Sequence, residues 1–401
     1  MRRGTGTATP WHMLTGEYPP VPGGVADYTR LVAADLAASG GEVHVWTTPA
    51  DGDTPQDAGV TVHRAAGWSP GGLAALDAAL GPFPSPARLL VQYTPGSWGY
   101  RGANLGFCRW LRRRARKGDD VRTMIHEGYY HFRFPDRPRR WALSVAHRLM
   151  MRDLLAASSH VYCSMPYWQG RLRPYDPRPG RPIRWLPVPS TIPVVDDPPA
   201  AAETRRRLAR GGAAVIGNFG TFGDDMRRLL RRILPPLLDG REDRVGLLIG
   251  RNSGDFADEL RVSHPGIGGR LIATGGLDAG AASLHLQACD VLVQPYEFGV
   301  STRRTTTMAG LAHGLPVVTT FGNVTEPLWA ESGGVAGLDV ADLASLPAVV
   351  DGLLADGEAR AALGRRARAL YEGRFTVRRT VETLLGDEDP VAEKRGRHFV
   401  P

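Results

Sequence analysis

Two adjacent arginines, Arg303 and Arg304, stand in the stretch 290–326, which reads DVLVQPYEFGVSTRRTTTMAGLAHGLPVVTTFGNVTE. The loop before them supplies Gly299, Ser301 and Thr302. Guanidinium groups bind phosphate through paired hydrogen bonds, and free backbone N–H groups at the start of a helix bind anions. We therefore expect this loop, with free backbone N–H groups and two guanidinium groups, to hold a diphosphate.

A glycine pair and a histidine are candidates in the first half of the chain. Gly23 and Gly24 end the loop 15–24, TGEYPPVPGG, and His126 follows the apolar segment 121–125. Glycine lets the backbone approach an anionic ligand closely. His126 is expected at the carboxyl end of a strand, where open α/β sheets bind ligands. The alternatives are a plain turn at the glycines and a structural role for the histidine.

The arginine loop is expected inside a strand–helix–strand unit. Apolar runs at 291–293 and 315–319 predict two buried strands, and 305–313 predicts a helix that Gly314 terminates. Such a unit places its loops and helix N-termini beyond the carboxyl ends of parallel strands. The candidate anion site would therefore lie at the edge of a parallel sheet.

The same alternation of apolar runs and helical segments covers most of the chain. Further strands are predicted at 11–14, 43–47, 60–63, 88–91, 121–125, 161–164, 183–186, 213–218, 245–250 and 271–274. Helices are predicted at 25–39, 104–115, 141–156, 226–238, 282–288, 360–371 and 377–385, the fourth interrupted near Pro235. This pattern predicts an α/β fold with doubly wound parallel sheets.

Length and proline content divide the chain. A chain of 401 residues is too long for one ordinary core. The segment 187–193 has three prolines in seven residues, which break regular structure. We place the interdomain linker at 187–195, the N-terminal domain at 10–190 and the C-terminal domain at 196–370.

Composition excludes several classes of protein. No apolar run approaches the ~20 residues that span a bilayer, and residues 1–9 read as a disordered leader without a signal peptide. Cys108, Cys163 and Cys289 lack metal-binding spacing, which predicts buried free thiols and a reducing cytoplasm. The net charge of +8 comes almost entirely from arginine and is discounted as a bias of composition. Such a charge can indicate anionic ligands, a membrane surface or nucleic acid, but no nucleic-acid-binding motif is present. The charged tail beyond Gly386 is expected to be loose.

An ordered set of motifs spans residues 13–385. The first domain opens GEYPPVPGGVADYTRLVAADLAASGGEVHVWTT, and the second carries GNFGTFG, LLIGRNS, ATGGL, ACDVLVQPY, GVSTRR and LAHGLPVVTT. This set resembles the GT-B glycosyltransferases of family 4, in a branch that carries GVS-x-RR. The resemblance implies a retaining, nucleotide-sugar-dependent enzyme with two Rossmann-like domains facing each other across a cleft.

The resemblance also implies roles for matching positions in the first domain. Gly23 and Gly24 match the glycine pair beside the donor diphosphate. His126 matches a histidine near the transferred sugar. The last helix, 371–386, matches the segment that crosses back from the second domain to the first.

In the second domain the resemblance implies a donor-binding set. The first loop of this domain contains Gly220, and the loop 299–304 matches the segment whose backbone meets the donor sugar and phosphates. This loop comprises Gly299, Val300, Ser301, Thr302, Arg303 and Arg304. Glu326 matches a glutamate that follows the next glycine.

The chain departs from the family at two places. The family usually carries two glutamates eight residues apart, where this chain has Ser301 and Ala309. The usual arginine and lysine of the second domain's first loop are absent from GNFGTFGDD. Arg251, Arg303 and Arg304 are then the nearest cations for the diphosphate.

The expected function is transfer of a sugar from a nucleotide-diphosphate donor to an acceptor hydroxyl, without a metal ion or a resident cofactor. The aromatic loops 92–100 and 129–134 could shape the acceptor site, and the basic segment 109–117 allows a peripheral membrane contact at the inner face. The acceptor could be a small molecule, a lipid-linked sugar or a saccharide. A non-catalytic partner subunit and a nucleotide-dependent oxidoreductase are the alternatives, although no G-x-G-x-x-G follows the first strand.

Overall fold

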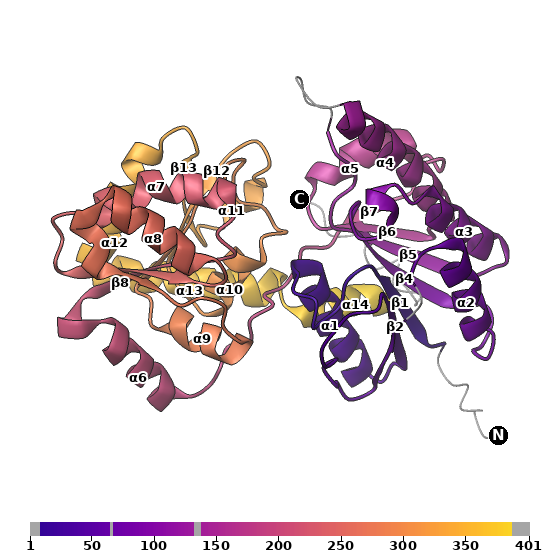
Figure 1. Ribbon diagram of the computed structural model, residues 1–401, viewed down its shortest axis with the longest axis horizontal. Helices are drawn as coiled ribbons and strands as arrows, with labels where there is room; N and C mark the ends of the chain where they lie inside the picture. The colour runs from indigo at the N-terminus through magenta and orange to yellow at the C-terminus, as the bar shows by residue number, and fades with distance from the viewer. Residues whose placement is uncertain (1–8, 65–66, 132–137, 387–401) are drawn as a thin grey trace. The chain divides into compact units, whose positions relative to one another are not determined.

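The computed structural model describes residues 9–64, 67–131 and 138–386, which form two compact units (Figure 1). Unit 1 contains the described residues up to Pro187 together with those from Val377 onward, and unit 2 is Val188–Thr376. The first eight residues, the tail beyond Gly386 and positions 132–134 of the predicted aromatic loop lie outside the described residues.

Unit 1 is built on a parallel sheet with the strand order β3-β2-β1-β4-β5-β6-β7. Its strands are β1 (Trp11–Thr15), β2 (Val43–Thr47), β3 (Val60–Arg64), β4 (Arg88–Tyr93), β5 (Asp120–Ile125), β6 (His160–Cys163) and β7 (Ile183–Trp185). The order reverses between β1 and β4, and β1 and β2 are buried along their whole lengths. Such burial is typical of parallel strands covered on both faces.

The helices of unit 1 come from both ends of the chain. They are α1 (Gly24–Ala38), α2 (Pro70–Leu80), α3 (Leu105–Arg116), α4 (Pro138–Ala157), α5 (Tyr167–Leu172) and α14 (Val377–Gly386), with short 3-10 turns η1 (Tyr100–Gly102) and η2 (Arg173–Tyr175). The last helix, α14, packs against α1. Arg122 of β5, which is buried, donates from Nη1 to the Leu384 carbonyl at 2.8 Å. This bond satisfies a carbonyl that the end of α14 leaves open.

Unit 2 has a parallel sheet with the strand order β10-β9-β8-β11-β12-β13. Its strands are β8 (Ala214–Phe219), β9 (Arg244–Ile249), β10 (Leu271–Ala273), β11 (Val291–Gln294), β12 (Val317–Phe321) and β13 (Ala336–Asp339). Its helices are α6 (Pro198–Leu208), α7 (Asp224–Leu238), α8 (Ser253–Ser263), α9 (Ala279–Gln287), α10 (Thr305–Ala312), α11 (Pro327–Glu331), α12 (Leu346–Ala355) and α13 (Gly357–Arg374), with 3-10 turns η3 (Arg210–Gly212), η4 (Pro265–Arg270) and η5 (Leu343–Ser345).

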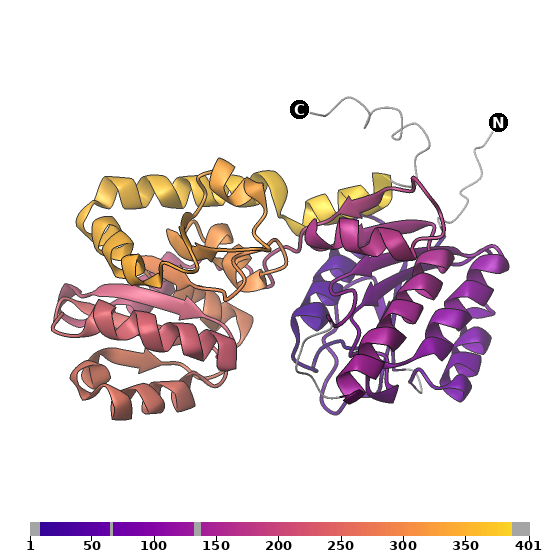
Figure 2. The same cartoon turned by 90° about the horizontal axis from the view of Figure 1, so that it is seen from above.

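Helices cover both faces of the unit 2 sheet, as Figure 2 shows from above. Alternate residues of each strand point to opposite faces, so Leu247 joins one buried cluster and Leu248 the other. One cluster takes its α-helical residues from α7, α8 and α12, and the other from α6, α9, α10, α11 and α13. The core of this unit therefore lies on both sides of one sheet.

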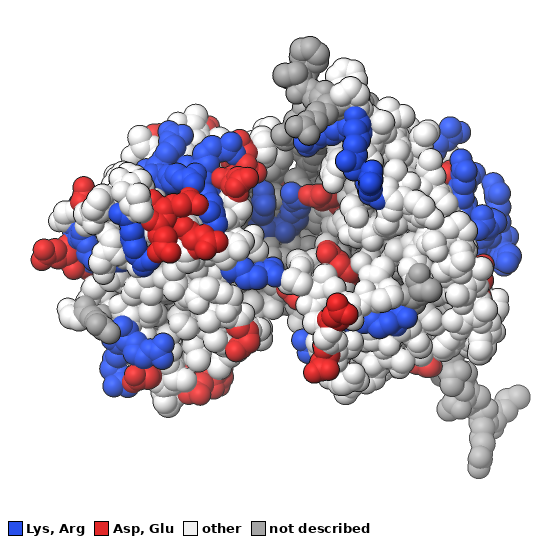
Figure 3. All heavy atoms as spheres, in the orientation of Figure 1, with Lys and Arg blue, Asp and Glu red and all other residues white. Residues whose placement is uncertain are grey.

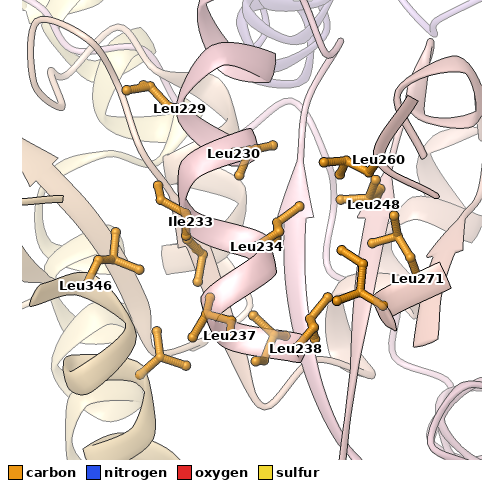
Figure 4. Packing of buried hydrophobic residues seen from close by; sticks show 14 of the residues in the cluster. Leu229, Leu230, Ile233, Leu234, Leu237, Leu238, Leu248, Leu260, Leu271 and Leu346 are labelled. Carbon is orange, nitrogen blue, oxygen red and sulfur yellow. The ribbon is translucent and has the colours of Figure 1, made fainter. Parts of the chain in front are cut away.

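Helix α7 runs through two prolines. The sequence predicted an interruption near Pro235, but α7 is continuous to Leu238 with Pro235 and Pro236 inside it, so that prediction is wrong. An interior proline costs about 3 kcal/mol, whereas a buried leucine contributes about 1.5–3 kcal/mol. Six apolar side chains of α7 are buried, and Figure 4 shows them pointing toward neighbouring strands and helices. Their packing outweighs the cost of the prolines.

Most predicted elements are present within a few residues of the expected bounds. Every strand predicted from an apolar run is found, but β13 was missed because its sequence, AGLD, has no such run and is only half-buried. Helix α6 was read as part of the proline-rich linker region. Its prolines occupy the first helical turn, where their missing N–H costs nothing, and Asp197 caps it by accepting from Ala200 N at 3.0 Å.

The three cysteines are buried free thiols, as predicted. Burial raises the pKa of Cys163 and Cys289 to about 12, so both remain protonated thiols at neutral pH. No helix among the described residues combines the length and apolar character needed to cross a bilayer.

Candidate functional site

A pocket of about 460 Å³ lies at the carboxyl ends of β8 and β11, where the strand order of unit 2 reverses. Its wall consists of residues 219–226, Leu229, residues 295–298, Arg304 and Thr306. Open α/β sheets bind their ligands at such a reversal. We call this cavity the switch-point pocket.

Two helices begin at the wall of the switch-point pocket. Helix α7 starts after Gly223 and α10 starts after Arg304, and no side chain caps either N-terminus. The first intrahelical bonds are Arg227 N to the Gly223 carbonyl and Met308 N to the Arg304 carbonyl. The first three N–H groups of each helix therefore have no acceptor within the helix, and they carry the positive end of its dipole.

Arg304 provides a positive side chain at this pocket. Its guanidinium carbon lies 4.6 Å from the centre of the Tyr296 ring, and both residues line the wall. The Tyr296 hydroxyl is within 2.8 Å of the Thr306 hydroxyl and 2.7 Å of the Thr307 hydroxyl. Burial raises the pKa of Tyr296, with Arg304 opposing, so the phenol is neutral and its ring can support the cation. Arg303 is not one of the described residues that line this pocket.

The loop before α10 uses its own backbone N–H groups internally. Gly299 N donates to the Tyr296 carbonyl at 3.1 Å, and Val300 N to the Thr320 carbonyl at 2.8 Å. Arg304 N donates to the Ser301 carbonyl at 3.0 Å. The expectation that this loop presents free N–H groups is therefore wrong at Gly299, Val300 and Arg304. Among the described residues, the first turn of α10 still has N–H groups without an acceptor within the helix.

Hydrogen bonds between Thr302 and Glu326 stabilise the same loop from its buried side. Glu326 Oε1 accepts from both the N–H and the hydroxyl of Thr302, and Oε2 accepts from the Trp329 indole at 2.8 Å. Ser301, Thr302 and Glu326 are all buried. The structure thus gives these three predicted site residues a place behind the pocket wall, where they hold the loop.

Gly299 is required where this loop meets the loop after β12. Its φ is +88°, and a side chain there would place Cβ 2.3 Å from Gly322 N and 2.2 Å from the Thr325 hydroxyl oxygen. Only glycine fits so close an approach. The contact fixes the loop against β12 and orients the start of α10.

Gly220 lines the pocket, whereas Arg251 does not belong to its described wall. The Gly220 carbonyl packs against Gly250, whose φ is +125° and where a Cβ would lie 2.0 Å from that oxygen. Arg251 is exposed, and its aliphatic part runs beside Gly276 in the loop after β10. The structure therefore brings Gly220 and Arg304 together in one pocket wall, whereas Arg251 lies beside Gly276.

The pocket wall also carries three carboxylates. Asp224 and Asp225 occupy the first turn of α7, and Glu297 follows β11. Asp225 and Glu297 both bind Arg228, the second at 3.2 Å. Acidic residues at this end of a helix complement its dipole, but they also oppose an incoming diphosphate.

The predicted residues of unit 1 gather at the carboxyl ends of its strands. His126, which is buried, has Nε2 2.9 Å from the Gln92 amide oxygen. The centres of the His126 and Tyr28 rings are 4.8 Å apart, and the rings are nearly perpendicular. Tyr28 lies one turn into α1, the helix that Gly23 precedes and Gly24 begins. A Cβ at Gly23 would come 2.9 Å from Glu17, whereas one at Gly24 would meet nothing within 4 Å. Gly24 therefore has open space beside it.

Several pocket residues were not singled out from the sequence. Asp224 and Asp225 could have been found, because Gly-Asp-Asp before a helical pattern marks a helix start two residues earlier than predicted. Tyr296 and Thr306 carry no such signal, because their relation depends on how the loop after β11 folds over α10.

Comparisons with known proteins give a consistent fold. No model of a known protein family matches this chain, and no curated protein sequence matches it. Among solved structures, sucrose-phosphate synthase from Thermosynechococcus elongatus superposes with a TM-score of 0.70 at 16% identity, covering 95% of this chain and 98% of the other. Anabaena HepE in complex with UDP-glucose gives 0.65 at 14% identity, covering 95% and 99%. WaaG, a glycosyltransferase involved in lipopolysaccharide biosynthesis, gives 0.66 at 15% identity, covering 93% and 98%.

At these identities the likeness concerns the fold. The predicted fold class, GT-B with two Rossmann-like parallel-sheet domains, is confirmed by the two sheets and by these neighbours.

Proposed function

We propose that this chain is a glycosyltransferase that moves a sugar from a nucleotide-diphosphate donor to an acceptor hydroxyl. The observation that carries the proposal is the switch-point pocket, where the N-termini of α7 and α10 meet beside Arg304. Backbone donors, two helix dipoles and a guanidinium group suit a diphosphate better than a neutral ligand.

The reaction breaks the bond between the anomeric carbon and the oxygen of the β-phosphate. A new bond forms from the acceptor oxygen to the same carbon, and the acceptor proton leaves with the nucleoside diphosphate. Negative charge grows on the leaving oxygen, and donors placed beforehand stabilise that charge. In this proposal Arg304 and the first turn of α10 supply that stabilisation, so the chemistry uses no metal ion. Retention of the anomeric configuration and membership of family 4 belong to the same proposal, on the resemblance of the motifs.

In this proposal, residues of unit 1 orient the transferred sugar or the acceptor. His126 is held by Gln92 and Tyr28 at a strand end, and Gly24 has open space at the start of α1. We assign His126 to orientation of the transferred sugar or the acceptor, and the glycine pair to close approach of the donor. Arg303 and Arg251 are assigned to the outer, solvent-facing part of the donor.

A uridine nucleotide is the first donor to test. The neighbour HepE was solved with UDP, with UDP and glucose, and with UDP-glucose. Thermal unfolding of the purified chain should shift upward with UDP, and slow release of UDP from UDP-sugars should accompany it. Absence of a shift with UDP, GDP, ADP and dTDP species would remove the proposal.

A non-catalytic, glycosyltransferase-like subunit is the second candidate. It is favoured by Asp224 and Asp225, which occupy the first turn of α7 directly after the loop where the resembling family carries an arginine and a lysine. Nucleotide binding without hydrolysis of any nucleotide sugar and without transfer to any acceptor would support this second function. The glycosyltransferase proposal is supported if the native chain transfers sugar and Arg304→Ala lowers this transfer. Arg206→Ala, on the exposed face of α6, should leave the transfer unchanged.

A further inference from the structure

Helix α4 carries an apolar stripe on its exposed face. Trp141, Val145 and Leu149 follow one another at intervals of four residues and are 43%, 50% and 48% exposed. Residues four apart lie on one side of a helix. The opposite side is already packed, because Ser144, His147, Met150, Met151, Leu154 and Leu155 are buried. The stripe is therefore additional to the face that unit 1 buries.

Arginines accompany the stripe at both ends. Arg139 and Arg140 precede Trp141, and Arg152 follows Leu149 by three residues. The acidic residue of α4, Asp153, is bound by Arg112 of α3 at 2.6 Å. The exposed part of the helix therefore has a net positive charge. In Figure 3 basic side chains lie over the part of unit 1 where α4 and α5 are drawn, and others follow its outer edge over α3.

A hollow adjoins the end of the stripe. Its volume is about 430 Å³, and its wall consists of Arg148, Leu149, Arg152 and residues 174–177. The acid in this wall, Asp176, has a side chain that is only 2% exposed, and it is paired with Arg181 at 2.9 Å. Arg148 also donates to the Tyr130 and Ser144 carbonyls, so Arg152 is the more accessible cation of the hollow. Among the described residues of this wall, none is an exposed carboxylate that would oppose an anion.

We propose that the exposed face of α4 is a docking surface for an anionic lipid bilayer. The apolar stripe would enter the boundary between headgroups and acyl chains, with Trp141 at the depth that indole rings favour. Arg139 and Arg152 would stay at the level of the lipid phosphates, and the hollow beside Leu149 would receive a headgroup phosphate.

Charge and size favour a bilayer over a protein partner. Three half-exposed side chains on one helix offer far less than the roughly 800 Å² per partner of a stable protein interface. Shallow insertion of an amphipathic face, combined with basic side chains, is sufficient for reversible attachment to an anionic surface. The proposal concerns attachment alone and does not depend on sugar transfer.

Flotation of the full chain with lipid vesicles tests the proposal. The native chain should float with phosphatidylcholine vesicles that contain phosphatidylglycerol, more weakly with added salt, and not with phosphatidylcholine alone. The double variant Val145→Glu and Leu149→Glu should bind about tenfold more weakly or worse, and Arg139→Gln with Arg152→Gln should lose a similar factor at low salt. Far-UV circular dichroism confirms that each variant is folded.

Two control variants match these changes elsewhere on the molecule. Val262→Glu alters an apolar side chain that is 83% exposed on α8, and Arg206→Gln with Arg207→Gln removes two exposed charges from α6. Both should bind like the native chain. The proposal is overturned if the native chain fails to float at low salt, or if these controls weaken binding as much as the α4 variants. It is also overturned if the acidic α4 variant abolishes a dimer of this chain and leaves vesicle binding unchanged.

Discussion

Thr302 donates twice to one oxygen of Glu326, from its backbone N–H at 3.1 Å and from its hydroxyl at 2.7 Å. The other carboxylate oxygen accepts from the Trp329 indole. Glu326 is thus an acceptor for three donors in a buried site, and it ties the loop before α10 to the segment that begins α11. The loop that carries Arg304 is held by this carboxylate.

Glu326→Gln should lower the free energy of unfolding by about 1–3 kcal/mol. The new amide N–H₂ must face either the Thr302 donors or the Trp329 donor, so buried donors lose their acceptor. Urea unfolding measures the loss. Glu331→Gln, at the exposed end of α11, is the matched control and should change little. Equal stability of both variants would contradict the role assigned to Glu326.

Arg304→Ala should lower turnover of a nucleotide sugar by about 10²-fold, with a stability change of less than about 1 kcal/mol. Arg304 lines the pocket, and the described wall does not include Arg303, so Arg303→Ala should cost less. Arg304→Lys should fall between the native chain and Arg304→Ala, because lysine keeps the charge but loses the planar fork. Steady-state kinetics with a nucleotide sugar measure the turnover of the three variants. Native turnover in Arg304→Ala would refute the assignment of the leaving-group cation.

Asp224→Asn should tighten binding of a nucleoside diphosphate by roughly threefold to tenfold, because it removes a like charge from the pocket wall. The same change weakens the interaction with the α7 dipole by about 0.3–1 kcal/mol. Calorimetry at low and high salt should show the gain shrinking as salt rises. Asp258→Asn, on the exposed face of α8, controls for net charge. Weaker binding in Asp224→Asn would indicate that the carboxylate contacts a hydroxyl of the ligand instead.

Stability should fall in acid through a histidine cluster of unit 1. His12 is buried beside His44 and His63, with Trp46 Nε1 donating to its Nδ1 at 3.2 Å. Burial lowers the pKa of His12 from 6.5 to about 3, helped by the charges of His44, His63 and Arg114, and Glu42 bonds to His44. Because the unfolded chain takes up the proton first, stability is intact above pH 6.5 and declines as pH falls toward 3.

Below pH 6.5, the pKa of His12 in the unfolded chain, the free energy of unfolding should fall by about 1.4 kcal/mol per pH unit because of this one proton. Urea unfolding at a series of pH values measures it. His12→Gln, whose amide oxygen can accept from the Trp46 indole, should flatten the curve, whereas His264→Gln in unit 2 should leave it unchanged. A native curve that is flat from pH 6.5 downward would contradict the burial argument.

Gly24→Ala should separate activity from stability. A Cβ at this position meets nothing within 4 Å, and alanine favours a helix, so the free energy of unfolding should stay equal or rise slightly. Turnover should nevertheless fall if the donor approaches the backbone here. Gly71→Ala is the matched control, because it lies in the first turn of α2 with equally open space. Full activity in Gly24→Ala would show that the glycine pair forms a turn and has no role in donor binding.

The sequence predicted the fold well because parallel strands buried on both faces leave continuous apolar runs. The runs at β9 and β11 are of this kind, whereas β13 lacks one and was missed. The prolines of α6 were read as breaking regular structure, although they occupy its first turn. Helices α2, α8 and α12 were not predicted either, although each buries apolar side chains. Continuous apolar runs therefore predict the central strands, whereas short helices with few buried residues leave a weaker pattern in the sequence.

The candidate site was predicted in part. Gly220 and Arg304 line the same pocket, as their positions after β8 and before α10 suggested. The commitment of the Thr302 N–H to Glu326 could not be read from the sequence, because the acceptor lies 24 positions further along the chain. The same holds for Gly299, whose close neighbour is Gly322. Which backbone N–H groups are free depends on contacts between loops, and the local sequence pattern does not reveal these contacts.

Arg122 binds the carbonyl of Leu384, which lies 262 positions later in the chain. During synthesis on the ribosome, most of unit 1 emerges first, but its last helix follows only after unit 2 has been made. The face of α1 that receives α14 stays uncovered throughout that interval, while unit 2 has every one of its strands available. The first half of the molecule is therefore completed only after unit 2 has been synthesised, and a chain shortened before Val377 would leave that half unfinished.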